Sequence, residues 1–372
     1  LTADLAPGGV LTKTGAGTLR LTGDVTSNSS VVVGAGSMVI AGNVNTTAGT
    51  TTLGSAGNMG RMLLESGSSY TTTTLALGAT NTLGSLVIRG GQLNITTPTL
   101  SAGISLGGAG YGGLFVSSGS VFTNRVDSVD GLTPAAIAVL QVSGGTLNTA
   151  DYIMFRNQRW DFTVTGGEVQ RTGNHIALAF RSGSNTTNAT TTAEGAMTVA
   201  GGLVNNAGFV VTIGQQNDAS AKGTGHLNLN AGTLITNQIL HYNGAGSATT
   251  ARVNFNGGLL RASANTTLFL GTTGSGGTGT LNAYVNGAFG SFAGGAVIDS
   301  NGFNVAITTG LLAPTGDGVS GIALTSGGGG YSGAPYVEIT GGGGSGATAS
   351  ATVDLDPASS TFGQVLAITV TN

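Results

Sequence analysis

The chain has 372 residues, of which 68 are glycine, and only 7% are Asp, Glu, Lys or Arg, with a formal net charge of −3. Because Lys13 and Lys222 are the only lysines and the arginines are scattered, the composition argues against phosphate-driven nucleic-acid binding. The absence of cysteine excludes disulfides and thiolate metal sites, and no run of about 18 apolar residues is present to span a membrane as a helix.

The first sixty residues contain two related stretches, GGVLTKTGAGTLRLTGDV (8–25) and SVVVGAGSMVIAGNV (30–44). The first resembles the autotransporter-associated β-strand repeat, a Gly-, Thr- and Leu-rich unit of secreted bacterial passenger domains, and the second is a looser echo of it. The resemblance is carried mainly by GAGTLRLTG and implies a right-handed parallel β-helix displayed outside the cell. We therefore expect residues 1–60 to form N-terminal coils of this type.

From residue 61 to residue 310 the dominant signal is a nine-residue pattern that recurs at intervals of about 28 residues. Each copy reads apolar, any, apolar, any, small, Gly, any, apolar, any. The seven copies are LVIRGGQLN (86–94), LFVSSGSVF (114–122), LQVSGGTLN (140–148), FTVTGGEVQ (162–170), MTVAGGLVN (197–205), LNLNAGTLI (227–235) and VNFNGGLLR (253–261). A decayed earlier copy is RMLLESGSSY (61–70).

This pattern predicts one coil of a parallel β-helix per repeat. The first and third positions share one face of a strand, so their apolar side chains point into the core. The small-Gly pair permits a turn with positive φ, after which the next apolar residue opens a strand in a new direction. Uneven spacing fits, since solenoids tolerate insertions at their corners. A ladder of stacked amides is expected at the ninth position, which holds Asn94, Asn148, Gln170 and Asn205.

The composition changes after LLAPTGDG (311–318), which we interpret as a linker. Residues 311–372 alternate short β-type segments with Gly runs and predict a small Gly-rich β module. Because VLAITVTN (365–372) begins like the earlier segment SGIALTSGGGGY (320–331), we expect the terminal strand to be exposed, unpaired and adhesive. The candidate assembly strand contains Val365, Leu366, Ile368 and Val370.

Motifs of catalysis are weak in this chain. GISLG (103–107) matches the Gly-x-Ser-x-Gly elbow through Ser105, but that elbow needs a helix after the serine, and the glycines that follow cannot hold one. We interpret the match as chance. The three histidines, His175, His226 and His241, do not share metal-ligand spacing and are predicted to lie at the surface or at corners. We predict no cofactor and no metal site.

The one concentration of charged and aromatic side chains runs from Asp151 to Arg181. Its candidate ligand or contact residues are Asp151, Tyr152, Arg156, Arg159, Trp160, Asp161, Arg171 and His175. Residues one coil apart stack closely, so these groups are expected to gather on one flank, where polysaccharide lyases of this fold use acid-bound calcium and a basic residue. The chain has no Asp-Asp pair and no Asn-Thr-Asp motif of the galacturonase kind, and mutual pairing of arginines and carboxylates is the simpler interpretation.

The leading hypothesis is a non-enzymatic, all-β structural protein, secreted or at the cell surface, that acts as an adhesin or as a filament subunit. Copies would join head to tail by terminal strand addition, so the main expected partner is a second copy of the chain. One alternative is a polysaccharide-binding or polysaccharide-cleaving β-helix that uses the Asp151 to Arg181 flank. Another is an adhesin in which Trp160, Tyr152 and nearby arginines hold a sugar by stacking. Neither nucleic acid nor a membrane span is expected.

Overall fold

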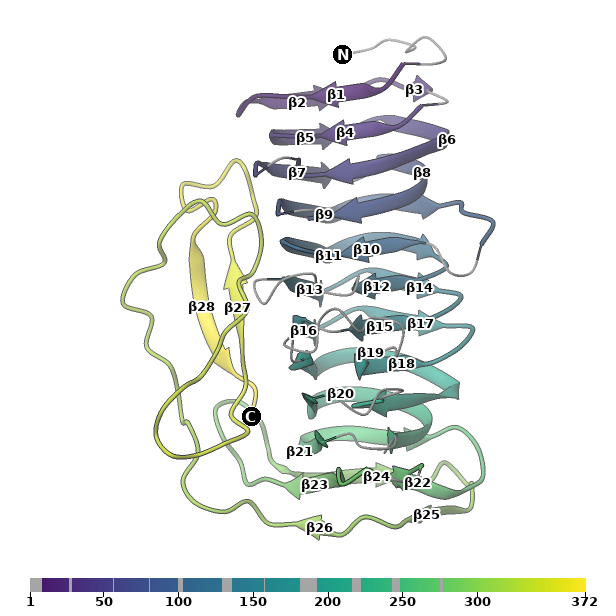
Figure 1. The fold of residues 1–372 in the computed structure, drawn as a ribbon, viewed down its shortest axis with the longest axis vertical. Coiled ribbons are helices and arrows are strands. Elements are labelled where there is room, and N and C mark those ends of the chain that lie inside the picture. The colour runs from purple at the N-terminus through teal and green to yellow at the C-terminus, as the bar shows by residue number, and fades with distance from the viewer. Residues whose placement is uncertain are drawn as a thin grey trace.

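A computed structural model shows a parallel β-solenoid with a two-stranded hairpin along one side (Figure 1). The structure describes residues 9–26, 29–55, 57–79, 81–99, 103–128, 136–156, 158–180, 193–215, 222–242, 248–274 and 277–372. Every regular element in these residues is a β-strand, which confirms the all-β parallel solenoid. In each coil the chain passes through three sheets in turn and then enters the next coil.

The first sheet carries the beginning of each nine-residue repeat, and its strands pair in parallel from one coil to the next. It contains β2 (Thr18–Leu21), β5 (Gly36–Ile40), β7 (Met59–Leu64), β13 (Ile137–Val142), β16 (Arg159–Val164), β23 (Leu281–Val285), β26 (Leu311–Leu312) and the first parts of β9 (Leu83–Ile95), β11 (Tyr111–Thr123), β19 (Ala193–Ile213), β20 (Lys222–Tyr242) and β21 (Ala248–Ala262). Since β26 pairs with β23, the solenoid extends just past the boundary expected at residue 310.

The second and third sheets complete each coil. The second sheet contains β3 (Val25–Thr26), β14 (Thr146–Thr149), β17 (Glu168–Arg171), β24 (Gly295–Asp299), the first parts of β6 (Asn43–Leu53) and β8 (Ser69–Leu77) and the later parts of β9, β11, β19, β20 and β21. The third contains β1 (Leu11–Lys13), β4 (Val31–Val33), β10 (Ile104–Leu106), β12 (Val126–Ser128), β15 (Ile153–Arg156), β18 (Ile176–Phe180), β22 (Thr266–Thr273), β25 (Val305–Ile307) and the ends of β6, β8, β19 and β20. Ser105 lies in the middle of β10, so GISLG is not a nucleophile elbow.

The register confirms the repeats at their first positions, and it shifts irregularly at some of the corners. The first residues of all seven copies stack on one another, from Leu86 through Leu114 to Val253, and Met62 of the decayed copy stacks on Leu86. The N-terminal stretches join the same column, because Leu19 pairs with Met38 and Met38 with Met62. These inward positions form one continuous buried core along the solenoid.

In five of the seven copies the glycine at the sixth repeat position has positive φ, whereas in the first and last copies the positive φ is at the fifth position, Gly90 and Gly257. Gly145, Gly167, Gly202 and Gly232 have φ between 65° and 70°, the left-handed region that other residues rarely adopt. The glycines also lie against one another from coil to coil, so that a Cβ on Gly167 would come within 2.4 Å of the Gly145 carbonyl oxygen. The corner therefore excludes any side chain.

The amide ladder expected at the ninth position stacks in register, since Asn148 pairs with Gln170 and Gln170 with Asn205. These amides do not bond one another in the described structure, however. Asn148 Nδ2 donates to the Val121 carbonyl (3.3 Å), and Gln170 donates to Glu168 within its own strand. The ladder prediction holds for position and is wrong for hydrogen bonding.

A continuous amide stack occurs instead at the fourth position of the last repeats. Asn256 Nδ2 donates to Asn230 Oδ1 (2.7 Å), and Asn286 Nδ2 donates to Asn256 Oδ1 (2.6 Å). The stack ends on Asn372, whose Oδ1 accepts from Asn286 at 2.6 Å. The last residue of the chain is thus tied to the flank of the solenoid.

The hairpin of β27 (Ala349–Val353) and β28 (Val365–Val370) covers the outward face of the first sheet (Figure 1). A second apolar cluster forms there, separate from the solenoid core. Its buried members are Val39, Leu63, Val87, Tyr111, Phe115 and Val139 of the solenoid and Ala334, Ala351, Val353 and Val365 of the C-terminal segment. The expected Gly-rich β module therefore exists, and it is docked along the flank.

Candidate functional site

Five of the candidate flank residues lie together at the corner between the second and third sheets. There, Arg125 pairs with Asp151 (Nη2 to Oδ2, 2.8 Å) and with Asp127 (3.5 Å), while Arg156 also pairs with Asp127 (2.7 Å). The second Asp151 oxygen accepts from Asn174 Nδ2 at 2.6 Å. The groups come from successive coils, as expected, and the hydrogen-bonding capacity of Asp151 is used within the cluster. Arg125 and Asp127 were missed because they lie one coil before the chosen run.

Arg171 is buried in the same corner, with 4% of its surface exposed. It donates to Asn206 Oδ1 (3.0 Å), to the Thr149 hydroxyl (3.0 Å) and to the carbonyls of Asp151 and Gly173. Burial lowers the pKa of Arg171 to about 9, so the guanidinium is still charged at neutral pH. It holds three segments of backbone together.

Tyr152 and His175 complete this corner. The Arg125 guanidinium lies 5.1 Å from the centre of the Tyr152 ring, a cation–π distance, and the His175 ring meets Tyr152 edge-on at 5.9 Å. Burial, and secondarily the charge of Arg171, lowers the pKa of His175. Arg181, the end of the predicted run, lies outside the described residues.

The other three candidates belong to β16 in the first sheet and are not part of that corner. Trp160 is fully buried in the solenoid core and stacks on Phe155 with ring centres 5.0 Å apart. Its ring therefore does not face solvent, because residue 160 is an inward position of the strand. Arg159 and Asp161 point outward toward the hairpin side, where Arg159 pairs with Glu338 at 3.1 Å.

Asp161 anchors the docked hairpin. Its carboxylate accepts from the Thr163 hydroxyl (2.8 Å) and from the Ser350 hydroxyl of β27 (2.9 Å). Gln141 Nε2 reaches both Asp161 Oδ2 (3.3 Å) and the Ala351 carbonyl (3.1 Å). Burial raises the pKa of Asp161, and the three donors oppose that rise.

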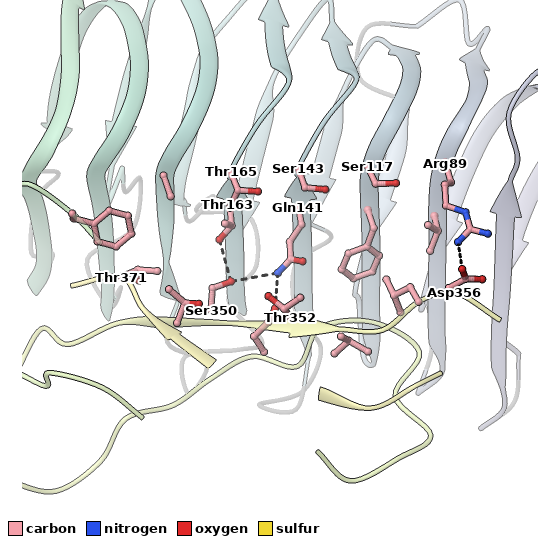
Figure 2. Close-up of a pocket in the computed structure, with 18 residues that line it drawn as sticks. Arg89, Ser117, Gln141, Ser143, Thr163, Thr165, Ser350, Thr352, Asp356 and Thr371 are labelled. Atoms are coloured by element: carbon pink, nitrogen blue, oxygen red, sulfur yellow. Dashed lines mark hydrogen bonds and ion pairs between the residues drawn. The ribbon is translucent and has the colours of Figure 1, made fainter. Parts of the chain in front are cut away.

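A cavity of about 370 Å³ lies between the first sheet and the hairpin (Figure 2). On the solenoid side it is lined by hydroxyls from the fourth position of successive repeats, Ser117, Ser143 and Thr165. The Arg89–Asp356 ion pair (2.9 Å) closes one end. These two are the charged groups among the lining residues, and they neutralise each other.

This cavity offers hydrogen bonds from hydroxyls and apolar surface from Val87 and Phe115. The sequence prediction missed it because no single repeat contains it. A signal was present, since outward positions Val39, Leu63 and Val87 are apolar where a solvent-facing strand would be polar.

Two histidines contradict the surface prediction. His226 has 5% and His241 0% of its surface exposed. His241 Nδ1 lies 2.8 Å from the Ile213 carbonyl oxygen, and His226 is covered by the C-terminal segment. Strand alternation places His226 outward, so only the docked segment buries it.

The terminal strand is also not unpaired. β28 pairs antiparallel with β27, and Val365 and Val370 are buried, whereas Leu366 keeps 51% of its surface exposed. The Asn228 amide and the Asn230 amide both hydrogen-bond Thr371, just after β28. The candidate assembly strand is thus engaged within its own chain.

The coil at the C-terminal end of the solenoid is open. Among the described strands β24, β25 and β26 pair only with β21, β22 and β23, on one side. Ile307 and Leu311 occupy inward positions, because they pair with the buried residues Leu270 and Ala283 of the preceding coil. Even so, 36% of the surface of Ile307 and 47% of the surface of Leu311 are exposed. The apolar interior of the solenoid reaches solvent at this end.

The geometry defines an all-β parallel solenoid with a docked hairpin. No protein-family model, no curated protein and no solved structure matches this chain. The described part of the chain has no helix whose length and apolar character would let it cross a bilayer. Within the same residues, His, Asp and Glu side chains do not assemble in groups of three or more placed to hold a metal ion.

Proposed function

We propose that the chain is a structural β-solenoid of the extracellular space or cell surface, an adhesin or filament subunit whose copies stack head to tail. The observation that carries this proposal is the open end coil, where Ile307 and Leu311 expose the solenoid core. Exposed inward positions at the end of a stack are what a further coil would cover.

The polarity of the strands supports a second copy as the occupant. At the other end of the described solenoid, β1, β2 and β3 also pair on one side only, with β4, β5 and β6. Leu11 and Leu19 at that end are only partly buried. The two end coils present complementary edges of one parallel stack, so that a copy added head to tail continues the same pairing. Contacts of this heterologous kind do not close and grow a fibre.

The extracellular location rests on the resemblance of residues 8–25 to the autotransporter-associated repeat. Leu19 and Leu21 of that stretch stack on Met38 and Ile40 of the second stretch, as coils of a solenoid do. A surface rod of this kind needs stiffness and exposed length more than catalytic groups. The terminal strand of residues 365–370 is the less favoured contact, because β27 and the solenoid already engage it.

The test is electron microscopy and sedimentation of the purified chain over a range of concentrations. We expect the intact chain to form filaments, and the double variant Ile307→Asp, Leu311→Asp to remain monomeric with an unchanged melting temperature. Leu366→Asp is the matched control, because Leu366 is comparably exposed and lies on the hairpin. Filaments that persist in the double variant, or an intact chain that stays monomeric at all concentrations, would refute the proposal. Loss of filaments in Leu366→Asp alone would move the contact to the terminal strand.

A further inference from the structure

A second cavity, of about 310 Å³, lies between the solenoid and the C-terminal segment. Its lining residues differ from those of the cavity drawn in Figure 2. Its walls are the outward face of β16, β19, β20 and β21 on one side and residues 336–339 and 344–349 on the other. Six titratable side chains line it, Asp161, Glu194, His226, Arg252, Tyr336 and Glu338, together with the hydroxyls of Thr224, Thr250, Ser345 and Thr348. It is the more polar of the two interface cavities.

Three nitrogens of lining residues are buried without a hydrogen-bond partner in the described structure, Trp160 Nε1, His226 Nδ1 and Arg252 Nε. The Trp160 ring belongs to the solenoid core, so His226 and Arg252 are the two that concern the cavity. The two residues stack directly on each other in adjacent coils. His226 is more than nine-tenths buried, and leaving a buried polar group unpaired costs about 1–3 kcal/mol. A polar cavity with unmet bonding capacity holds water or a ligand rather than empty space.

The charges around the cavity restrict what that ligand is. Glu338 pairs with Arg159, and the Asp161 carboxylate already accepts from Gln141, Thr163 and Ser350. The remaining charged groups of the lining are Glu194 and Arg252, which together oppose both a bound anion and a bound cation. The Glu194 carboxylate accepts hydrogen bonds, whereas Arg252 donates them. A hydroxyl group both donates and accepts, so a neutral ligand with several hydroxyls satisfies both kinds of partner.

We propose that this cavity binds one neutral sugar unit. The volume equals that of about ten water molecules, which is enough for a single hexose ring and its hydroxyls. Tyr336 supplies an aromatic wall, a common feature of small-ligand sites. Burial and the nearby carboxylates raise the pKa of Tyr336, which keeps its hydroxyl protonated as a donor.

This sugar site is independent of the proposed filament. It lies on the flank between β16 and β21, whereas the assembly contact uses β24, β25 and β26 at the end of the stack. It also differs from the corner of Asp151 and Arg171, where arginines and carboxylates already satisfy one another. A monomeric chain would therefore bind the sugar with the same affinity as a chain within a filament.

The test is calorimetric titration of the intact chain with D-glucose, D-galactose and D-mannose, and with disaccharides of each. We expect saturable binding of at least one sugar, and a loss of tenfold or more in Arg252→Ala. The matched control is Arg261→Ala, which removes an exposed arginine of the same strand that pairs with Asp299. That control should bind as the parent does. Glu194→Gln, which keeps the shape of the side chain, provides a second variant if Arg252→Ala unfolds.

Binding of disaccharides and not of monosaccharides would assign the site to a glycan chain, and the reverse would assign it to free sugars. No binding of any of these sugars would show that water alone fills the cavity and would overturn the proposal. Equal binding by the parent, by Arg252→Ala and by Glu194→Gln would also overturn the proposal, because the sugar would then bind elsewhere. Preferential binding of glucuronate would refute the neutral ligand.

Discussion

Acid should destabilise the solenoid in part through His226, one of the two histidines buried in the described structure. Burial is the main cause that lowers its pKa from 6.5 to about 3, and the charge of Arg252 adds to the effect. The folded protein therefore keeps His226 neutral where the unfolded chain protonates it. Stability is complete above pH 6.5 and is lost as the pH falls below that value, by about 1.4 kcal/mol per pH unit. Between pH 6.5 and pH 4.5 the loss from this residue is about 2 kcal/mol.

The assay is urea unfolding at pH 7 and pH 4.5, followed by the fluorescence of Trp160, the only tryptophan. Trp160 reports on the right region, because β16 pairs with β19 and β19 with β20, which carries His226. In His226→Asn the acid-induced loss should be smaller than in the parent by about 2 kcal/mol, whatever the variant's stability at pH 7. Other titrating groups, including Asp161 with its raised pKa, cancel in this difference. Equal losses in the two proteins would refute the reasoning.

Two further substitutions test the corner and the hairpin. In a denaturant melt, Gly167→Ala should lower the free energy of unfolding by more than the roughly 1–2 kcal/mol that positive φ alone costs, because its Cβ meets the Gly145 carbonyl. The control is Gly208→Ala, which has φ of 79° and open space around it and should show only the conformational cost. Phe115→Ala should cost about 3–5 kcal/mol of local stability and speed amide exchange in β27 and β28. The exposed Phe122→Ala on the same strand should change neither, and identical behaviour of the two variants would contradict the docked hairpin.

The coil architecture was predictable because its determinants are local. An inward position such as Leu140 must be apolar and a corner such as Gly145 must be glycine in every repeat, so the period appears directly in the sequence. The stacking of Leu86, Leu114 and Leu140 follows from that period alone.

The interface features were not predictable from local patterns, since they depend on a segment more than a hundred residues away. His226 and Asp161 look like solvent-facing strand residues, and only residues 336–350 bury them. The run from Asp151 to Arg181 looked like one site because its members are close in sequence. Between Asp151 and Asp161 it crosses from the third sheet to the first, so neighbours in the chain face different sides of the rod.

The docked hairpin also governs how rods meet sideways. Val39, Leu63, Val87 and Phe115 form an apolar strip along the flank, and such a strip left bare would drive rods to bundle laterally. By occupying it with its own C-terminal segment, the chain removes this apolar strip from contact with a neighbouring rod. Growth in one dimension, without thickening, is the consequence for any assembly built from this unit.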